Sequence, residues 1–343
     1  FVKVDMMKEP LSPLPITDEE ANLFTTGWGL TGFNTLGYTM GDVTMTPDYP
    51  RAAQLASDMQ KAIVGDDIDG VFAVDPVFLQ YMLGIVGGTQ LPDGTVVDGS
   101  NAAKVLLHDI YWNYPVEEQD AIFAAVAGSA FNKIVDELGS SDITKIAGAI
   151  EKGASEGRIL MYSRNDDEEK AAKALGISGA LQNDASEAPI LGVFVNNYSY
   201  SKMDWFLDKR VTIDSSVENA DGSTTYRVTT TLKNTMTPQE KAEMPGYFRG
   251  HNGISEDIDD EVLRLYLYAP AGGSISDIKT SGSGSIEMNE ATHDGLKVAW
   301  GGVHMLLGQD IKVEYTVTTS KDSRHKELKV RTTPTAQTFE QDK

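Results

Sequence analysis

The stretch DMQKAIVGDDIDGVFAVDPVFLQYMLGIV, residues 58–86, decides the fold class of the first half of this chain. Its middle, residues 68–75, is a short apolar run bounded by a glycine and a proline, which predicts a buried strand. Apolar residues recur at helical spacing on both sides of this run, over residues 52–64 and 78–86. The order helix, buried strand, helix predicts a layered α/β domain.

The period of the apolar pattern changes near residue 205, and alternation dominates from there on. Asp221-Gly222 marks a hairpin turn, and the alternating runs are spaced by about ten residues, which is typical of an antiparallel, immunoglobulin-like β-sandwich. We therefore expect a two-domain α+β protein. The α/β domain would span residues 1–205, the sandwich 206–331 and a flexible tail 332–343. Because the chain starts with a strand-like FVKV and no initiator methionine, we expect the α/β domain to be truncated at its N-terminus.

Composition excludes several classes of function. The chain has 343 residues, 29 of them basic and 51 acidic, giving a net charge of −22. A surface this acidic repels phosphate backbones, so we expect no nucleic-acid partner. The absence of cysteine excludes disulfides, thiol catalysis and thiolate metal sites. No uninterrupted apolar run reaches the length of about 18 residues that a membrane span requires.

Motifs for catalysis, metal binding and cofactor binding are also missing. The five histidines are scattered without metal-ligand spacing, and no G-x-S-x-G elbow occurs. Residues 27–32 match G-x-G-x-x-G, but the segment before them looks helical, whereas a dinucleotide site needs a strand there. Acidic clusters at 66–69 and 256–261 do not fit a calcium loop. We therefore predict no catalytic residue, no metal ligand and no cofactor.

Three candidate ligand-binding residues lie at the end of a predicted strand or at the predicted domain junction. Asp75 lies at the carboxyl end of the predicted strand 68–75, where α/β sheets place ligand groups, but it equally fits a helix cap before Pro76. Lys202 and Asp204 lie among aromatic residues at the predicted domain junction. They could contact a ligand or form an interdomain ion pair.

The other candidates are Arg51, Arg158 and Arg164, which are among the few basic residues of the first half. Guanidinium groups bind phosphate and carboxylate strongly because they offer paired donors. If the chain binds a phosphate or an acidic glycan there, these three arginines should converge on it.

Four segments carry a resemblance to a known family: TPDYPRAA (46–53), IDGVFAVDPVFLQYML (68–83), GRILMYSRNDDEEKAAKALGISGAL (157–181) and VFVNNYSYSKMDWFLDKRV (193–211). In this order they resemble an uncharacterised family of envelope-attached Gram-positive proteins, known as domain of unknown function number 4012. The resemblance implies a short cytoplasmic tail, one membrane helix and an extracellular body to which this chain belongs. It also implies that contact with the membrane is made only through an N-terminal helix absent from this chain.

A weaker resemblance reaches the LytR–CpsA–Psr phosphotransferases, which attach glycopolymers to peptidoglycan. Those enzymes hold a polyprenyl pyrophosphate with arginines and a metal-bound aspartate, so Mg²⁺ would be the metal. The matching region here, residues 108–123, contains no arginine.

Together these points predict an extracellular, membrane-anchored protein of the cell envelope, with a non-catalytic binding or scaffold role at the cell wall. The expected partner is a cell-wall glycopolymer or a surface protein, bound through the sandwich. The alternatives are a metal-dependent glycopolymer phosphotransferase and a structural spacer.

Overall fold

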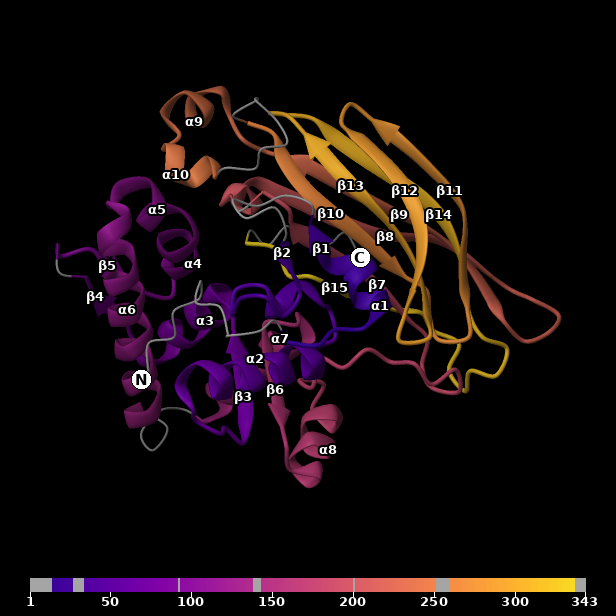
Figure 1. Ribbon diagram of the computed structural model, residues 1–343, viewed down its shortest axis with the longest axis horizontal. Coiled ribbons are helices and arrows are strands. Elements are labelled where there is room, and N and C mark those ends of the chain that lie inside the picture. The colour runs from indigo at the N-terminus through magenta and orange to yellow at the C-terminus, as the bar shows by residue number, and fades with distance from the viewer. Residues whose placement is uncertain are drawn as a thin grey trace.

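A computed structural model describes residues 14–26, 34–91, 93–137, 143–199, 201–250 and 259–336. The fold is mixed α+β, as predicted. In Figure 1 most helices gather on one side of the molecule, and two large sheets stack on the other.

The two large sheets form a sandwich. One has five strands in the order β12-β13-β10-β7-β15. Its strands are β12 (Ser285–His293), β13 (Leu296–Met305), β10 (Glu261–Tyr268), β7 (Ile190–Asn197) and β15 (Lys329–Thr332). The other has the order β11-β14-β9-β8. Its strands are β11 (Ser274–Gly282), β14 (Asp310–Thr318), β9 (Thr224–Asn234) and β8 (Leu207–Glu218).

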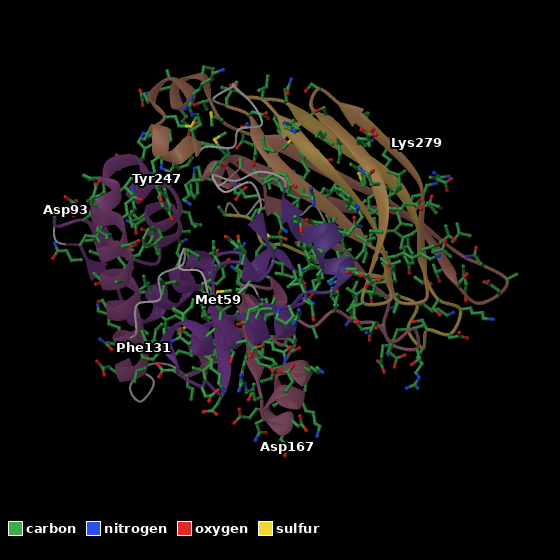
Figure 2. All side chains as sticks on the ribbon, viewed as in Figure 1. Met59, Asp93, Phe131, Asp167, Tyr247 and Lys279 are labelled. Atoms are coloured by element: carbon green, nitrogen blue, oxygen red, sulfur yellow. The ribbon has the colours of Figure 1, made fainter. Side chains whose placement is uncertain are left out.

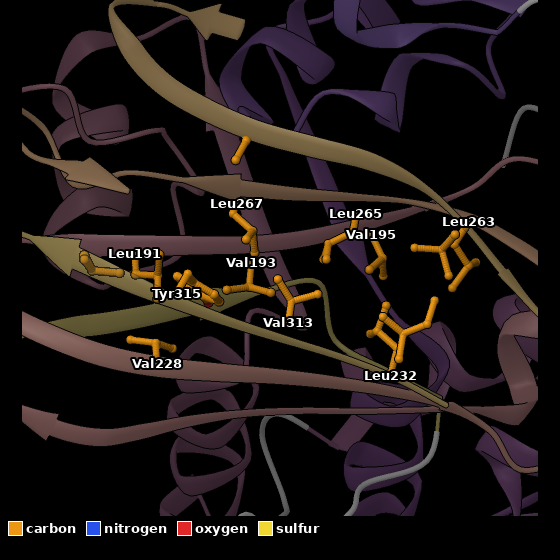
Figure 3. Close-up of a cluster of buried hydrophobic side chains, with 14 of the residues drawn as sticks. Leu191, Val193, Val195, Val228, Leu232, Leu263, Leu265, Leu267, Val313 and Tyr315 are labelled. Atoms are coloured by element: carbon orange, nitrogen blue, oxygen red, sulfur yellow. The ribbon is translucent and has the colours of Figure 1, made fainter. Parts of the chain in front are cut away.

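The main core lies between these sheets (Figure 3). Val193 and Leu265 of one sheet and Leu232 and Val313 of the other are fully buried there. Their alternation along the strands is the period-two pattern of the sequence, because successive side chains point to opposite faces of a sheet. Fully burying such a side chain contributes about 1.5–3 kcal/mol. This core is the largest cluster of buried apolar side chains among the described residues.

A helical layer covers the outer face of the five-stranded sheet. It consists of α1 (Asp18–Phe24), η1 (Val43–Met45) and α2 (Tyr49–Val64). Thr17 caps α1 through a capping box with Glu20. Phe24 and Met59 pack from this layer against Tyr266 and Tyr268 of β10. Every residue of β10 is therefore buried, because both faces of the strand are covered.

Strand β7 belongs to the sandwich although it precedes the predicted boundary at residues 205/206. It pairs antiparallel with β10 and parallel with β15. Its residues from Leu191 to Val195 are all buried, since α2 and its neighbours cover one face and the second sheet covers the other. The sandwich thus includes a strand from the range assigned to the first domain.

The predicted central strand is β3 (Gly70–Val74), flanked as expected by α2 and α3 (Pro76–Val86). It forms a two-stranded antiparallel sheet with β6 (Ile159–Ser163). Its predicted burial is wrong: Phe72 and Val74 are 59% and 54% exposed. The reason is that α2 covers only the face carrying Val71 and Ala73.

The remaining described elements surround this small sheet and the ends of the sandwich. They are β1 (Thr25–Thr26), β2 (Asn34–Thr35), β4 (Thr89–Gln90), β5 (Val96–Val97), α4 (Ala102–Lys104), η2 (Val105–Asp109), α5 (Ile110–Asn113), α6 (Val116–Glu137), α7 (Ile143–Ser155), α8 (Asp166–Ala174), η3 (Met203–Phe206), α9 (Pro238–Glu243) and α10 (Gly246–Arg249). Of the helices within the described ranges, none combines the length and the apolar character that crossing a bilayer requires.

Candidate functional site

A cleft of about 1530 Å³ opens between the helical part and one side of the sandwich. One wall is formed by two edge strands, β8 of the four-stranded sheet and β15 of the five-stranded sheet. The opposite wall is formed by the end of α7, the start of β6, and residues 176–188, which connect α8 to β7. Figure 1 shows β15 near the middle of the molecule and α8 below it.

The lining of this cleft is basic although the protein is acidic. It contains six basic side chains, Arg158, Lys173, Lys209, Arg210, Lys329 and Arg331. It contains three acidic ones, Glu156, Asp184 and Glu187. In a chain of net charge −22, this local excess of positive charge makes the cleft the natural place for an anion.

Arg158 is a buried member of the lining and joins the two walls. Its Nη1 lies 2.6 Å from Asp75 Oδ2, and its Nε lies 2.6 Å from Glu156 Oε2. Its Nη2 donates to the Thr335 carbonyl at 3.2 Å. Asp75 also accepts a hydrogen bond from the Phe78 amide at 2.7 Å, so it caps α3 as the sequence allowed. Burial raises the pKa of Asp75, and the charge of Arg158 acts against that rise.

Lys209 extends into the same region from β8. It lies between Leu207 and Val211, which both pack into the sandwich core, so this lysine is on the inward face of an edge strand. Its Nζ donates to the Thr333 carbonyl, just beyond β15. Burial, together with the charge of Arg158, lowers the pKa of Lys209 to about 7.

Arg331 of β15 holds the opposite wall through backbone carbonyls. Its guanidinium donates to Ala180 O at 2.7 Å and to Gly179 O at 2.5 Å. Burial lowers its pKa, and the charge of Asp48 opposes this shift. Gly179 has φ +66°, and a Cβ there would lie 2.7 Å from Tyr49 Cβ, so this close approach requires glycine.

The three arginines predicted from the sequence do not share a binding site. Arg51 pairs with Glu20 at 2.7 Å. Arg164 donates to Ser57 Oγ at 2.8 Å and lies 3.6 Å from Asp58. Only Arg158 lines the cleft. The convergence expected for an anion held by all three is not found.

Lys202 and Asp204 lie at the junction between the helices and the sandwich, within the aromatic cluster around Met203 and Phe248. Lys202 Nζ is 5.1 Å from the ring centre of Tyr111, and burial lowers its pKa. Asp204 accepts a hydrogen bond from Asn197 Nδ2 at 3.1 Å, and burial raises its pKa to about 6. The charges of Lys202 and Asp204 attract each other, but no direct ion pair joins the two side chains.

Glu261 is a second buried acid beside Asp204. It is fully buried, and neither of its carboxylate oxygens has a hydrogen-bond donor. Burial and the nearby charges of Asp204 and Asp260 raise its pKa well above the ordinary value. A carboxyl group in such a place is held in its neutral form.

In the part of the chain that the structure describes, no three His, Asp or Glu side chains are grouped so that they could hold a metal ion. The G-x-G-x-x-G segment at 27–32 and the acidic residues 256–258 lie outside the described residues. The predicted absence of a cofactor therefore remains a prediction.

Sequence reasoning missed Lys209 and Arg331, although both line the cleft. For Lys209 a signal was present: it alternates with Leu207 and Val211, which places a lysine on the core face of a strand. For Arg331 no local signal existed, because its partners lie about 150 residues earlier in the chain.

Comparison with known proteins gives a family but no activity. Residues 3–111 match the family described as "Protein of unknown function (DUF4012)", which confirms the predicted family resemblance. The match includes the segments 46–53 and 68–83, whereas the segments 157–181 and 193–211 lie beyond it. No curated protein matches the sequence.

One solved structure is similar over part of the chain. It comes from Legionella pneumophila and is described as a "putative nutrient binding protein". The identity is 11% and the TM-score is 0.22, with 39% of this chain and 44% of that chain covered.

Proposed function

We propose that this chain is a non-catalytic binding protein of the cell envelope, located on the outer side of the membrane, which holds an anionic cell-wall glycopolymer in the basic cleft. The ligand class is a polymer with phosphodiester or carboxylate groups along its backbone. The family match supports the proposal only in general terms, because that family is described without an activity.

The observation that carries the proposal is the charge of the cleft. The chain as a whole carries a net charge of −22 and repels polyanions, yet the lining of this cleft has six basic side chains against three acidic ones. Lys173 and Lys329 are exposed at its surface, where they can contact a passing chain.

The outer faces of the sandwich are less suited to a glycan. Sugar rings are usually held by exposed aromatic side chains, and the exposed apolar residues on the described sandwich strands are Ile213, Val217 and Val330, all aliphatic. The sandwich would therefore contribute to binding through its edge strands β8 and β15 rather than through a face.

Charge reversal in the cleft tests the proposal. The probe is poly(glycerol phosphate) of defined length, with a neutral polysaccharide for comparison, and the readout is equilibrium affinity by calorimetry. We expect the Lys173→Glu/Lys329→Glu double variant to lose about tenfold in affinity at low salt, because each reversal replaces a favourable contact of about 0.2–1 kcal/mol with a repulsive one.

The matched control is Lys279→Glu. Lys279 is exposed on β11, the strand at the opposite edge of the sheet from β8 (Figure 2). This variant has half of the charge change of the double variant but should bind like the unchanged protein. Equal losses in the two variants, or no binding of the polymer at all, would contradict the proposal.

The phosphotransferase alternative has no specific observation in its favour. Arg51, Arg158 and Arg164 are each engaged by different carboxylates. Nine charged side chains line the cleft, which does not suit the apolar tail of a polyprenyl carrier.

A further inference from the structure

We propose that Lys209 and Arg158 form a proton-dependent anion subsite in the cleft, in which Lys209 takes up a proton as an anionic group of the polymer binds. This inference rests on the proposed function and adds a regulation to it: the cleft would bind its polymer more tightly in acidic surroundings than in alkaline ones.

Lys209 and Arg158 both contact the backbone of the segment that follows β15. Lys209 Nζ donates to the Thr333 carbonyl, and Arg158 Nη2 donates to the Thr335 carbonyl at 3.2 Å. Both cations thus reach the same short segment after β15, although they come from opposite walls of the cleft.

The positive charges of Arg158 and Lys209 are compensated differently. Arg158 is compensated by Asp75 and Glu156, each at 2.6 Å. Lys209, in contrast, forms no ion pair with a described carboxylate, and its hydrogen-bond acceptor is a neutral carbonyl. A lysine that is partly buried and placed next to an arginine is costly when charged, which lowers its pKa to about 7.

A bound anion would change the protonation of Lys209. A phosphodiester group placed between Nζ of Lys209 and the guanidinium of Arg158 would supply the missing negative charge. It would favour the protonated form of Lys209. Binding and protonation are then linked. The polymer stabilises the charged form of Lys209, and protonation of Lys209 at low pH increases the affinity for the polymer.

Other charged groups near Lys209 do not explain a pH dependence between 6 and 8. No histidine lines the cleft. On β8 itself, Asp208 and Arg210 pair with each other at 3.2 Å. The remaining charged neighbours are Arg331 and Lys329 on β15, Lys233 opposite Asp208 on β9, Lys173 at the end of α8, and Asp184 and Glu187 before β7.

The alternative explanation is that Lys209 only protects an edge strand, since an inward-pointing charge discourages pairing with other chains. In that case its charge would matter for aggregation and stability and not for ligand binding. The two explanations differ in what a conservative variant does.

The experiment measures the affinity of poly(glycerol phosphate) at pH 6 and pH 8 for the unchanged protein, Lys209→Arg and Lys209→Met. The polymer is a suitable probe because its phosphodiester groups keep their charge in this range. Because the pKa of Lys209 in the protein without polymer is about 7, the unchanged protein should bind the polymer about tenfold more tightly at pH 6 than at pH 8.

Lys209→Arg should bind tightly at both pH values, because a guanidinium stays charged. Lys209→Met should bind weakly at both. A circular-dichroism melt of each variant shows that it is folded before its affinity is compared.

Two outcomes would overturn the inference. One is a tenfold pH dependence that persists in Lys209→Arg, and the other is an affinity at pH 6 that is the same in Lys209→Met as in the unchanged protein. If the polymer binds and only these variants behave unexpectedly, the inference fails while the proposed function stands. If the unchanged protein binds the polymer at neither pH, the proposed function fails with it.

Discussion

Two regions of this molecule bury charged groups, and they do so in opposite ways. At the cleft, Lys209 and Arg331 are cations at the edges of the sandwich, and they line an open volume of about 1530 Å³. At the junction, Asp204 and Glu261 are acids closed in by protein, and Glu261 is 0% exposed. Burial disfavours the charged form in both regions, but only the cleft gives a ligand access to the charged groups.

This difference in access is the reason why we assign the proposed binding to the cleft and not to the junction. The cations at the cleft keep neutral carbonyl partners that an anion can replace. The acids at the junction have buried carboxylate oxygens without a hydrogen-bond donor, and burying such oxygens is unfavourable for folding. The packing of the aromatic cluster around Phe248 offsets this unfavourable free energy. A perturbed pKa therefore does not by itself mark a functional site in this fold.

The largest effect is expected when Arg158 is replaced by methionine. The change leaves Asp75 and Glu156 without their partner, and breaking a buried ion pair costs about 3–5 kcal/mol of stability. Urea denaturation measures this loss. The matched control is Arg164→Met, whose ion pairs at 3.6 and 3.9 Å are partly exposed and should contribute less than about 1 kcal/mol. Equal losses would show that burial of the cleft arginine has no special importance.

A somewhat smaller effect, with the opposite sign, is expected for Asp204→Asn. The pKa of Asp204 is about 6 in the folded protein, whereas the ordinary value for an aspartate is 3.8. The folded state therefore holds the proton more tightly, and the stability contributed by the protonated form is lost as the pH rises from about 4 to 6. At pH 8 the asparagine variant should be more stable by about 3 kcal/mol, and at pH 3 it should gain almost nothing.

Thermal or urea unfolding at the two pH values checks this prediction. A variant that is less stable at pH 8 would mean that Asp204 is held in its charged form by interactions stronger than its burial.

Local patterns in the sequence predicted much of the secondary structure. The helices on both sides of β3 and the alternating strands after residue 205 are present. Each of these depends on neighbours within a few residues.

The sequence could not indicate which sheet a strand joins. Strand β7 is apolar on both faces, as a strand of an α/β sheet would be, because a helical layer covers one face and the second sheet covers the other. Conversely, Phe72 is apolar but exposed, since only one face of the two-stranded sheet is covered. These outcomes depend on contacts between distant segments.

The candidate site was predictable only in fragments. Arg158 and Asp75 were selected from the sequence and do meet, at 2.6 Å. Lys209 and Arg331 joined them only because two sheet edges and the loop after α8 come together in space. No spacing pattern in the sequence indicates that these residues lie close together in the fold.

The most direct test of the account is amide hydrogen exchange of the protein with and without poly(glycerol phosphate). If the polymer lies in the cleft, exchange should slow along the edge strands, at residues 209–213 and 329–335, and at 154–158 on the opposite wall. Strands β11 and β12, at the far edges of both sheets, should be unaffected. Protection confined to those far strands, or protection nowhere on a protein that binds the polymer, would contradict the account.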